Sequence, residues 1–260
     1  METAEIDEMY RLETQHWWYI GKRLLIDALL RDVPDRAALR ILDVGCGTGA
    51  VLAHVGGRGH TVGVDRSVQA LRYCRERGLA RLACAEGGRL PFAAATFDVI
   101  LLMDALEHFA EEGPLLEDVA RILRPDGWLL ISVPAFQFLW SEHDEVLHHF
   151  RRYTARTLRR ALEASHFTVE RLTYTNVVAF PPAVVLRGIV ARLGISRRRG
   201  TDFSVQSPWI NKALVAAYRL EAKALGRVRR FPFGLSVAAL ARPPVPNGAP
   251  RTSGATTDEG

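Results

Sequence analysis

Five short apolar runs, each followed by a longer amphipathic stretch, occupy the first half of the chain. Runs of this length and composition are typical of buried strands, and the stretches between them have the period of helices. Strands that alternate with helices form a parallel sheet that is covered on both faces. The predicted strands are residues 40–44, 60–65, 81–85, 97–102 and 127–133.

The second half of the chain adds two strands and a long insertion. Thr154 can cap a helix that runs to about Ser165, residues 167–174 alternate as a sixth strand, and residues 235–241 form a seventh. About sixty residues separate the last two strands, too many for a hairpin loop. We therefore predict a Rossmann-like α/β fold. It has a seven-stranded, mostly parallel sheet, helices on both faces and a helical insertion between strands six and seven.

Two helices are predicted within the insertion. Residues 181–193 are mainly apolar, and Ser207 and Pro208 provide an N-cap and a first-turn proline for a helix that Gly226 ends. We expect a lid or substrate-binding subdomain, since apolar residues recur along the second helix at helical spacing. These residues are Ile210, Ala213, Leu214, Ala217, Leu220, Ala224 and Leu225. The predicted division is a helical cap at 1–36, a ligand-binding core at 37–175, the insertion at 176–232, the last strand at 233–242 and a disordered tail at 243–260.

Positive charge is concentrated in the last part of the chain. The 260 residues have a net charge of +5, but residues 181–242 contain twelve Lys or Arg and only two acids, so the remainder is net negative. Almost all the basic residues are arginine, which the base composition of a genome can also produce. This basic region is either a solvated surface or a contact for an anionic membrane surface, a phosphorylated substrate or RNA.

Cysteine content and the length of the apolar runs bear on the compartment. Three cysteines without a C-x-x-C pair indicate neither a disulfide framework nor a zinc site, which is typical of the reducing cytoplasm. The acidic start lacks the features of a signal peptide, and no apolar run reaches the roughly 18 residues of a spanning helix. We expect a cytoplasmic protein without a bound metal. Its basic region could hold the protein at the inner face of the membrane.

The most specific signal lies at the end of the first predicted strand. Residues 41–49, ILDVGCGTG, predict a strand followed by a tight glycine turn, and Asp65 closes the next strand. An acid about 20 residues beyond such a turn can bind both hydroxyls of a ribose. A dinucleotide would place its pyrophosphate beside Asp43, which repels it, whereas the sulfonium and ammonium groups of S-adenosylmethionine are attracted. The pattern therefore favours S-adenosylmethionine over NAD.

Several further motifs resemble those of the class I S-adenosylmethionine-dependent methyltransferases. The resemblance covers about residues 10–175 and returns at 232–237, and its motifs at 16–19 and 140–153 are similar to those of a bacterial subgroup. It implies that the core at 37–175 binds S-adenosylmethionine and transfers its methyl group. The acceptor is an O, N or C atom of a small molecule or of a lipid or glycan precursor. The motifs are HWWY at 16–19, LPF at 90–92, TFDVI at 96–100, DALEH at 104–108, LRPDGWLLISVP at 123–134 and the segment at 140–153.

Eleven residues are candidates for contacting this donor. The family resemblance implies that glycines contact the methionine part of the donor and that acids bind its amino group and its ribose. Further residues flank the adenine or lie beneath the donor. Trp18 also suits core packing, Arg23 can bind the donor carboxylate in a bidentate way, and Glu86 stands where Asp is more usual. The candidates are Gly45, Gly47, Asp43 and Asp65, then Arg66, Glu86, Gly87, Met103 and Asp104, and finally Trp18 and Arg23.

The segment 140–153 concentrates three histidines and two arginines after the fifth predicted strand. One interpretation is an acceptor site with a general base, His143 or His149, that Asp144 orients. Another is an ion-paired loop that supports the sheet edge. A metal held by His143, Asp144 and His148 is a weaker interpretation, because no other cluster supplies ligands. In similar sequences glycine is common at the position of His148, so this residue is expected to alter the turn.

Methyl transfer from a sulfonium requires mainly that donor and acceptor are held in line, with a base only for a poor nucleophile such as a hydroxyl. His108, in the turn after the fourth strand, is either structural or part of this pocket. A tRNA or rRNA methyltransferase is disfavoured because no RNA-binding module is appended, and Asp43 disfavours an NAD-dependent oxidoreductase. A protein that binds S-adenosylmethionine without transferring its methyl group stays an alternative. The acceptor and the oligomeric state stay open.

Overall fold

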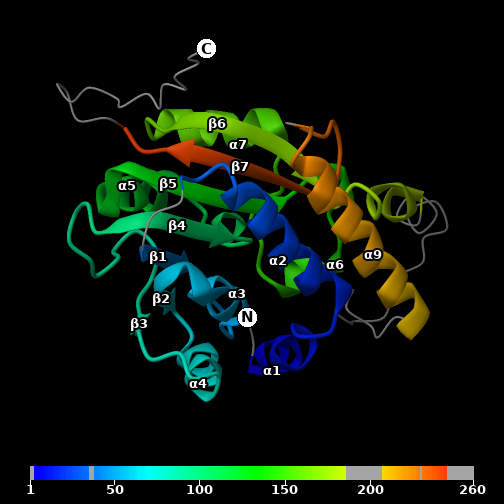
Figure 1. Ribbon diagram of the computed structural model, residues 1–260, viewed down its shortest axis with the longest axis horizontal. Coiled ribbons are helices and arrows are strands. Elements are labelled where there is room, and N and C mark those ends of the chain that lie inside the picture. Colours follow the sequence, from blue (N-terminus) through cyan, green and yellow to red (C-terminus); the bar gives the residue numbers. More distant parts are fainter. Residues whose placement is uncertain (1–2, 35–37, 186–206, 229, 245–260) are drawn as a thin grey trace, which may run out of the picture.

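A twisted sheet forms the centre of the molecule. The computed structural model describes residues 3–34, 38–185, 207–228 and 230–244. Within these residues the sheet has seven strands in the order β3-β2-β1-β4-β5-β7-β6, and only β7 runs against its neighbours (Figure 1). The predicted seven-stranded α/β fold is confirmed. The strands are β1 (Leu39–Val44), β2 (Gly59–Asp65), β3 (Leu82–Cys84), β4 (Phe97–Met103), β5 (Leu123–Pro134), β6 (Thr168–Thr175) and β7 (Ser236–Arg242).

Helices cover both faces because successive side chains of a strand point to opposite sides of the sheet. Leu42 of β1 packs in the same cluster as Leu115 of α5 and Leu158 of α7, whereas its neighbour Ile41 packs with Ile26 of α2 and Val55 of α3. The core is therefore divided by the sheet into two layers. The helices are α1 (Thr3–Leu12), α2 (Trp17–Leu30), α3 (Ala50–Val55), α4 (Val68–Glu76), α5 (Gly113–Ile122), α6 (Glu142–Val146), α7 (Ala155–Ala164) and α9 (Pro208–Leu225).

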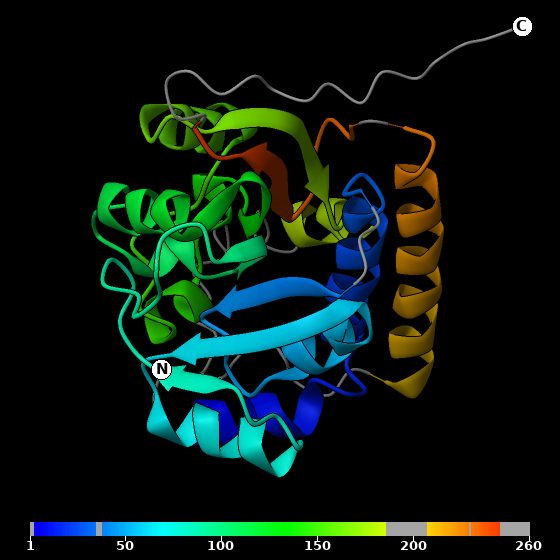
Figure 2. The same cartoon turned by 60° about the vertical axis from the view of Figure 1, so that its left-hand side comes forward.

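The insertion helix α9 lies alongside α2 (Figure 2). A Cβ at Gly21 of α2 would lie 2.3 Å from a ring carbon of Tyr218, so glycine allows this close approach. The apolar stripe predicted for α9 is only partly right, because Ile210 and Leu220 are 50% and 70% exposed. The buried face shares Leu225 with the predicted stripe and otherwise consists of Val215, Tyr218, Glu221 and Ala222.

Signals for the ends of two helices are confirmed. The hydroxyl of Thr154 accepts a hydrogen bond from the Thr157 N–H at 3.2 Å at the start of α7. Helix α9 has Ser207 at its N-cap, Pro208 in its first turn and Gly226 at its C-cap. The residue types at these positions were therefore sufficient to predict where the elements begin or end, although the Ser207 side chain makes no cap hydrogen bond.

Some predictions concern residues that the structure describes only in part. Residues 180–185 are helical, and the rest of the predicted helix at 181–193 lies outside the described residues, as does most of the predicted tail at 243–260. The division into cap, core, insertion and tail stays a prediction. Among the helices that are described, none has both the length and the apolar character needed to cross a membrane.

Candidate active site

A large cavity opens at the carboxyl ends of the parallel strands, where ligands of open α/β sheets bind. Its volume is about 1610 Å³, above the roughly 300–1,000 Å³ of an ordinary small-molecule site, so it has room for a donor and an acceptor. All eleven predicted donor contacts line it, although their individual roles stay predictions. They are Trp18, Arg23, Asp43, Gly45, Gly47, Asp65, Arg66, Glu86, Gly87, Met103 and Asp104.

The glycine turn after β1 has a backbone that glycine adopts far more readily than other residues. The φ angles of Gly45, Gly47 and Gly49 are +77°, +53° and +87°. The Gly45 N–H donates to the Val64 carbonyl of β2 at 2.8 Å, which fixes the turn against the neighbouring strand. The turn therefore presents backbone to the cavity, as a donor molecule lying on it requires.

Asp65 ends β2 beside this turn. Its Oδ2 accepts a hydrogen bond from the Gly47 N–H at 2.9 Å, and its Oδ1 accepts one from the Ser67 N–H at 2.8 Å. Each carboxylate oxygen has capacity for a second hydrogen bond, so two ribose hydroxyls can still donate to Asp65. The backbone thus holds the carboxylate in one orientation at the cavity wall.

Asp43 lies one residue before the end of β1 and is only 2% exposed. Burial raises its pKa to about 7, although the Lys22 ammonium acts in the opposite direction. A nearby cation stabilises the charged form of a buried carboxylate, and S-adenosylmethionine has two positive groups. Asp43 therefore fits a positively charged ligand and does not fit a pyrophosphate.

The N-terminal helices border the cavity through Glu13, which the sequence motifs did not single out. Its buried carboxylate accepts a hydrogen bond from the Thr48 hydroxyl of the glycine turn and pairs with Arg77. Arg23 donates to the Glu13 backbone carbonyl at 2.7 Å. Arg23 is therefore held at the cavity, where its binding of the donor carboxylate stays a prediction.

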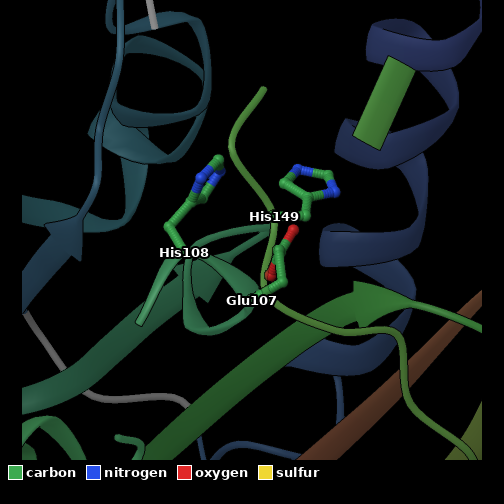
Figure 3. Close-up of side chains that lie close together, drawn as sticks. All are labelled: Glu107, His108 and His149. Carbon is green, nitrogen blue, oxygen red and sulfur yellow. The ribbon is translucent and has the colours of Figure 1, made fainter. Parts of the chain in front are cut away.

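Glu107, His108 and His149 also line the cavity (Figure 3). The first two belong to the short helical turn Leu106–His108 after β4, and His149 comes from the loop after α6. The imidazole rings of His108 and His149 are nearly perpendicular, with centroids 4.7 Å apart. Burial and the nearby His149 lower the pKa of His108 to about 4, so this ring is neutral at pH 7. His108 faces the pocket, one of its two predicted roles.

Glu107 is fully buried, and neither of its carboxylate oxygens has a hydrogen-bond partner among the described residues. Burial and then the neighbouring Asp104 carboxylate raise the pKa of Glu107 well above its ordinary value, while Lys22 and Arg152 oppose the shift. Lys22 forms an ion pair with Asp104 at 2.6 Å. Because buried polar groups are nearly always paired, Glu107 requires either a proton or a ligand.

Sequence reasoning missed Glu107 and Lys22 as site residues. Glu107 lies within the DALEH motif, which was used to recognise the family and not to assign a site. Lys22 is one of three lysines in a chain whose other basic residues are arginines. Neither the DALEH motif nor the rarity of lysine indicated that Glu107 and Lys22 both lie near Asp104.

Asp144 holds His149 in position. Its buried carboxylate lies 3.0 Å from Nδ1 of His149 and accepts hydrogen bonds from Arg152 Nε and the Ser141 N–H, each at 2.8 Å. Burial raises the pKa of Asp144, but the hydrogen bonds from His149 and Arg152 outweigh it, so the pKa lies well below its ordinary value. An ionised carboxylate only accepts hydrogen bonds, so we place the imidazole proton on Nδ1 and leave Nε2 as an acceptor. The two interpretations of the segment 140–153, an ion-paired loop and a histidine oriented by Asp144, therefore describe the same arrangement.

The other histidines of this segment differ in placement. His143 lines the cavity as well, but it is His149 that Asp144 orients. The metal set of His143, Asp144 and His148 does not form in the described structure, because His148 is exposed and the carboxylate of Asp144 binds His149 and Arg152. The φ angle of His148 is +57°, a conformation that glycine adopts more readily and that explains why glycine suits this position.

Sequence comparisons identify the family. A family model described as "Methyltransferase domain" matches residues 42–131. The ubiquinone biosynthesis O-methyltransferase of Thiobacillus denitrificans is 36% identical over 153 residues, which are 51% of this chain and 63% of that protein. The malonyl-[acyl-carrier protein] O-methyltransferase of Enterobacter lignolyticus is 28% identical over 180 residues, 65% of this chain and 72% of that protein. These matches support a class I S-adenosylmethionine-dependent methyltransferase domain that includes residues 42–131.

Solved structures agree on the fold of this class I methyltransferase. A phosphoethanolamine N-methyltransferase of Haemonchus contortus, bound to S-adenosylhomocysteine, has a TM-score of 0.55 at 17% identity and covers 84% of this chain and 52% of that one. A SAM-dependent methyltransferase of Aquifex aeolicus has a TM-score of 0.51 at 19% identity, with 67% and 93% covered. The matched segments span between 40% and 63% of the length of three ubiquinone-biosynthesis relatives. The cofactor of this family, S-adenosylmethionine, is the ligand that the glycine turn, Asp43 and Asp65 fit.

Proposed function

We propose that this class I methyltransferase transfers a methyl group from S-adenosylmethionine to an O, N or C atom of a small molecule or of a lipid or glycan precursor. The observation that supports the proposal is the shared cavity. The glycine turn and Asp65 line it, and so do Glu107, His108 and His149. Groups suited to a donor and groups suited to an acceptor thus face one volume, which favours an in-line displacement.

The side chains on the donor side bind and orient. S-adenosylmethionine supplies an electrophilic methyl group when it is bound. Asp65 holds the ribose, Asp43 lies beside the positive charge and Arg23 binds the carboxylate. For an amine, an acidic phenol or a stabilised carbanion, such positioning is sufficient for most of the rate acceleration.

A hydroxyl acceptor also needs a base, and we assign this role to His149. Asp144 holds Nδ1 of the ring at 3.0 Å, so Nε2 can accept the hydroxyl proton. Bound donor would supply the methyl group to the acceptor oxygen, and the ionised Asp144 would stabilise the imidazolium that forms on His149. His143 lines the same cavity and is the second candidate for this role.

The insertion gives the acceptor part of the cavity an apolar lining. An acceptor with an aromatic ring or a lipid chain fits such a lining better than a wholly polar one. The relatives named for ubiquinone biosynthesis and for malonyl-[acyl-carrier protein] support an acceptor of the small-molecule or carrier-linked class. The apolar lining residues are Ala179, Pro182, Ala183, Ile210 and Leu214.

An anionic membrane surface is the partner that we propose for α9. Trp209 is 78% exposed, and the Lys212 ammonium lies 5.4 Å from its ring centroid. Leu220, which is 70% exposed, lies about three turns further along the same face, next to Lys223. Exposed apolar side chains beside cations are typical of helices that bind the membrane interface. A lipid-linked acceptor would then reach the cavity from the bilayer surface.

Calorimetric titration tests the donor assignment. We expect S-adenosylmethionine and S-adenosylhomocysteine to bind and NAD not to bind. Methyl transfer from isotope-labelled donor to compounds in cell extracts, followed by mass spectrometry, then identifies the acceptor by the added methyl group. Binding of NAD in place of S-adenosylmethionine would refute the proposal. Donor binding without transfer to any acceptor would favour a non-methylating protein.

A further inference from the structure

We propose that Glu107, His108 and His149 bind a divalent transition-metal ion at the acceptor side of the cavity. Two imidazoles and one carboxylate are a common ligand set for Zn²⁺, Fe²⁺ and related ions in sites that keep a position open for substrate. Each of the three residues lines the cavity. The site differs from the set that the sequence suggested, since it takes two of its ligands from the turn after β4.

The geometry brings the three ligand atoms together. One nitrogen of each histidine and one oxygen of Glu107 all lie within 4.8 Å of one another, and in Figure 3 the three side chains surround a common space. Zn²⁺ binds nitrogen and oxygen ligands at about 2.0–2.2 Å, so two ligands of one ion are at most about 4.4 Å apart. Movements of less than about 1 Å would therefore bring the three atoms to coordination distance.

His149 is already held as a metal-binding histidine usually is. Such histidines donate one ring N–H to a carboxylate or carbonyl, which fixes the tautomer and directs the other nitrogen toward the ion. Nδ1 of His149 lies 3.0 Å from Asp144, and Asp144 is itself held by Arg152 and Ser141. This support keeps Nε2 available as a ligand.

Glu107 provides the second, independent observation. Its side chain is 0% exposed, and both of its carboxylate oxygens lack a hydrogen-bond partner among the described residues. Leaving a buried, ionised carboxylate without a partner is strongly unfavourable. An ion between Glu107 and the two histidines would remove this cost, because the metal charge replaces the missing hydrogen bonds.

The ion changes how the site handles a hydroxyl acceptor, and this part of the inference rests on the proposed function. In the ion-free protein, Nε2 of His149 can accept a proton. In the ion-bound protein the same atom is a ligand, and the ion would hold the acceptor oxygen and make its hydroxyl more acidic. Binding of the ion itself does not depend on methyl transfer.

Titration of the metal-free full-length protein with Zn²⁺, followed by calorimetry, tests the inference without donor or acceptor. We expect one ion per chain, and we expect Glu107→Gln and His108→Asn each to weaken its affinity at least about tenfold, because each removes a ligand. His148→Asn is the matched control, since this exposed neighbour of His149 should leave Zn²⁺ affinity unchanged. Thermal unfolding of each variant shows that the fold is kept, and Glu107→Gln preserves shape at the buried position.

A second probe is the visible absorption of Co²⁺, whose bands depend on its ligands. We expect the wild-type spectrum to indicate nitrogen ligation and the spectrum of His108→Asn to differ from it. Equal Zn²⁺ affinity in wild type, Glu107→Gln and His108→Asn would overturn the inference, as would the absence of Zn²⁺ binding to wild type. Either result would leave Glu107 as a buried side chain without a bound ion. Neither would affect the methyltransferase proposal, which donor titration tests separately.

Discussion

The two sides of the cavity are built in different ways. The donor side is made by the glycine turn after β1 and the end of β2, where the polar contacts are backbone hydrogen bonds to Val64 and Asp65. The acceptor side brings Glu107 and His108 close to His149, about forty residues further along the chain, and His149 is held in turn by the buried Asp144. One side depends on backbone conformation, and the other depends on buried charged side chains.

This difference indicates which side is more sensitive to substitution. A backbone turn keeps its shape when a nearby surface residue changes, because its own glycines and strand pairing determine it. Removing one member of a buried ionic network leaves an unpaired charge in the interior. We therefore expect substitutions on the acceptor side to reduce both activity and the free energy of unfolding. Substitutions on the donor side should reduce donor binding with little effect on the free energy of unfolding.

The largest effect is expected from Asp144→Ala. It leaves Arg152 buried without its carboxylate and should lower the free energy of unfolding by about 3–5 kcal/mol. Urea denaturation measures this change. Glu163→Ala is the control, because Glu163 forms an exposed ion pair with Arg159 and should cost less than about 1 kcal/mol. Equal effects of the two substitutions would show that the buried network does not stabilise the acceptor side.

Asp65→Ala should act on the donor side with the next largest effect. Loss of its charged hydrogen bonds is expected to weaken S-adenosylmethionine binding by about 1–3 kcal/mol, or roughly 5- to 150-fold. Calorimetry measures the affinity, and Asp27→Ala, at an exposed acid that pairs with His54 and Arg58, is the control. Unchanged affinity in Asp65→Ala would remove this residue from the ribose site.

The pH dependence of donor binding should report on Asp43. If the cationic donor binds the ionised form, affinity should rise about tenfold between about pH 6 and pH 8, since the pKa of Asp43 lies near 7. Asp43→Asn should remove most of this dependence. Calorimetry across this range measures it, and a wild-type affinity that is flat with pH would contradict the assignment.

The same raised pKa has the opposite sign for stability. Before ligand binds, the protonated form of Asp43 is favoured by folding, so its contribution is fully present below about pH 4 and is lost as pH rises through 7. Bound donor should reverse this trend by stabilising the ionised form. Denaturation at several pH values, with and without S-adenosylhomocysteine, separates the two effects.

Trp209→Ala should have the smallest effect on the protein itself. The side chain lies outside both buried regions and is 78% exposed, so the free energy of unfolding should change by less than about 0.5 kcal/mol. Flotation with vesicles that contain anionic lipid should nevertheless show weaker binding than wild type. Equal flotation of wild type and variant would argue against membrane contact through α9.

The fold and the donor side were largely predictable from sequence. The apolar runs gave six of the strands within about two residues of their observed ends; β5 begins four residues before the predicted run, at Leu123. The glycine turn and the two acids that end β1 and β2 all line the cavity as expected. These features are local: a strand, its turn and its terminal residue are adjacent in sequence, so the chain brings them together without help from distant segments.

The acceptor side and the packing of the insertion were decided by tertiary structure. The apolar residues of α9 allow more than one buried face, and only contact with Gly21 and its neighbours on α2 selected the face that contains Tyr218. Likewise, the segment 140–153 offered several histidines to Asp144, and the path of the loop brought His149 to it and to Glu107. Sequence alone therefore determined the sheet and the glycine turn with its two acids at the cavity. Contacts between distant segments determined which side chains meet the acceptor, because a local pattern contains no information about what packs against it.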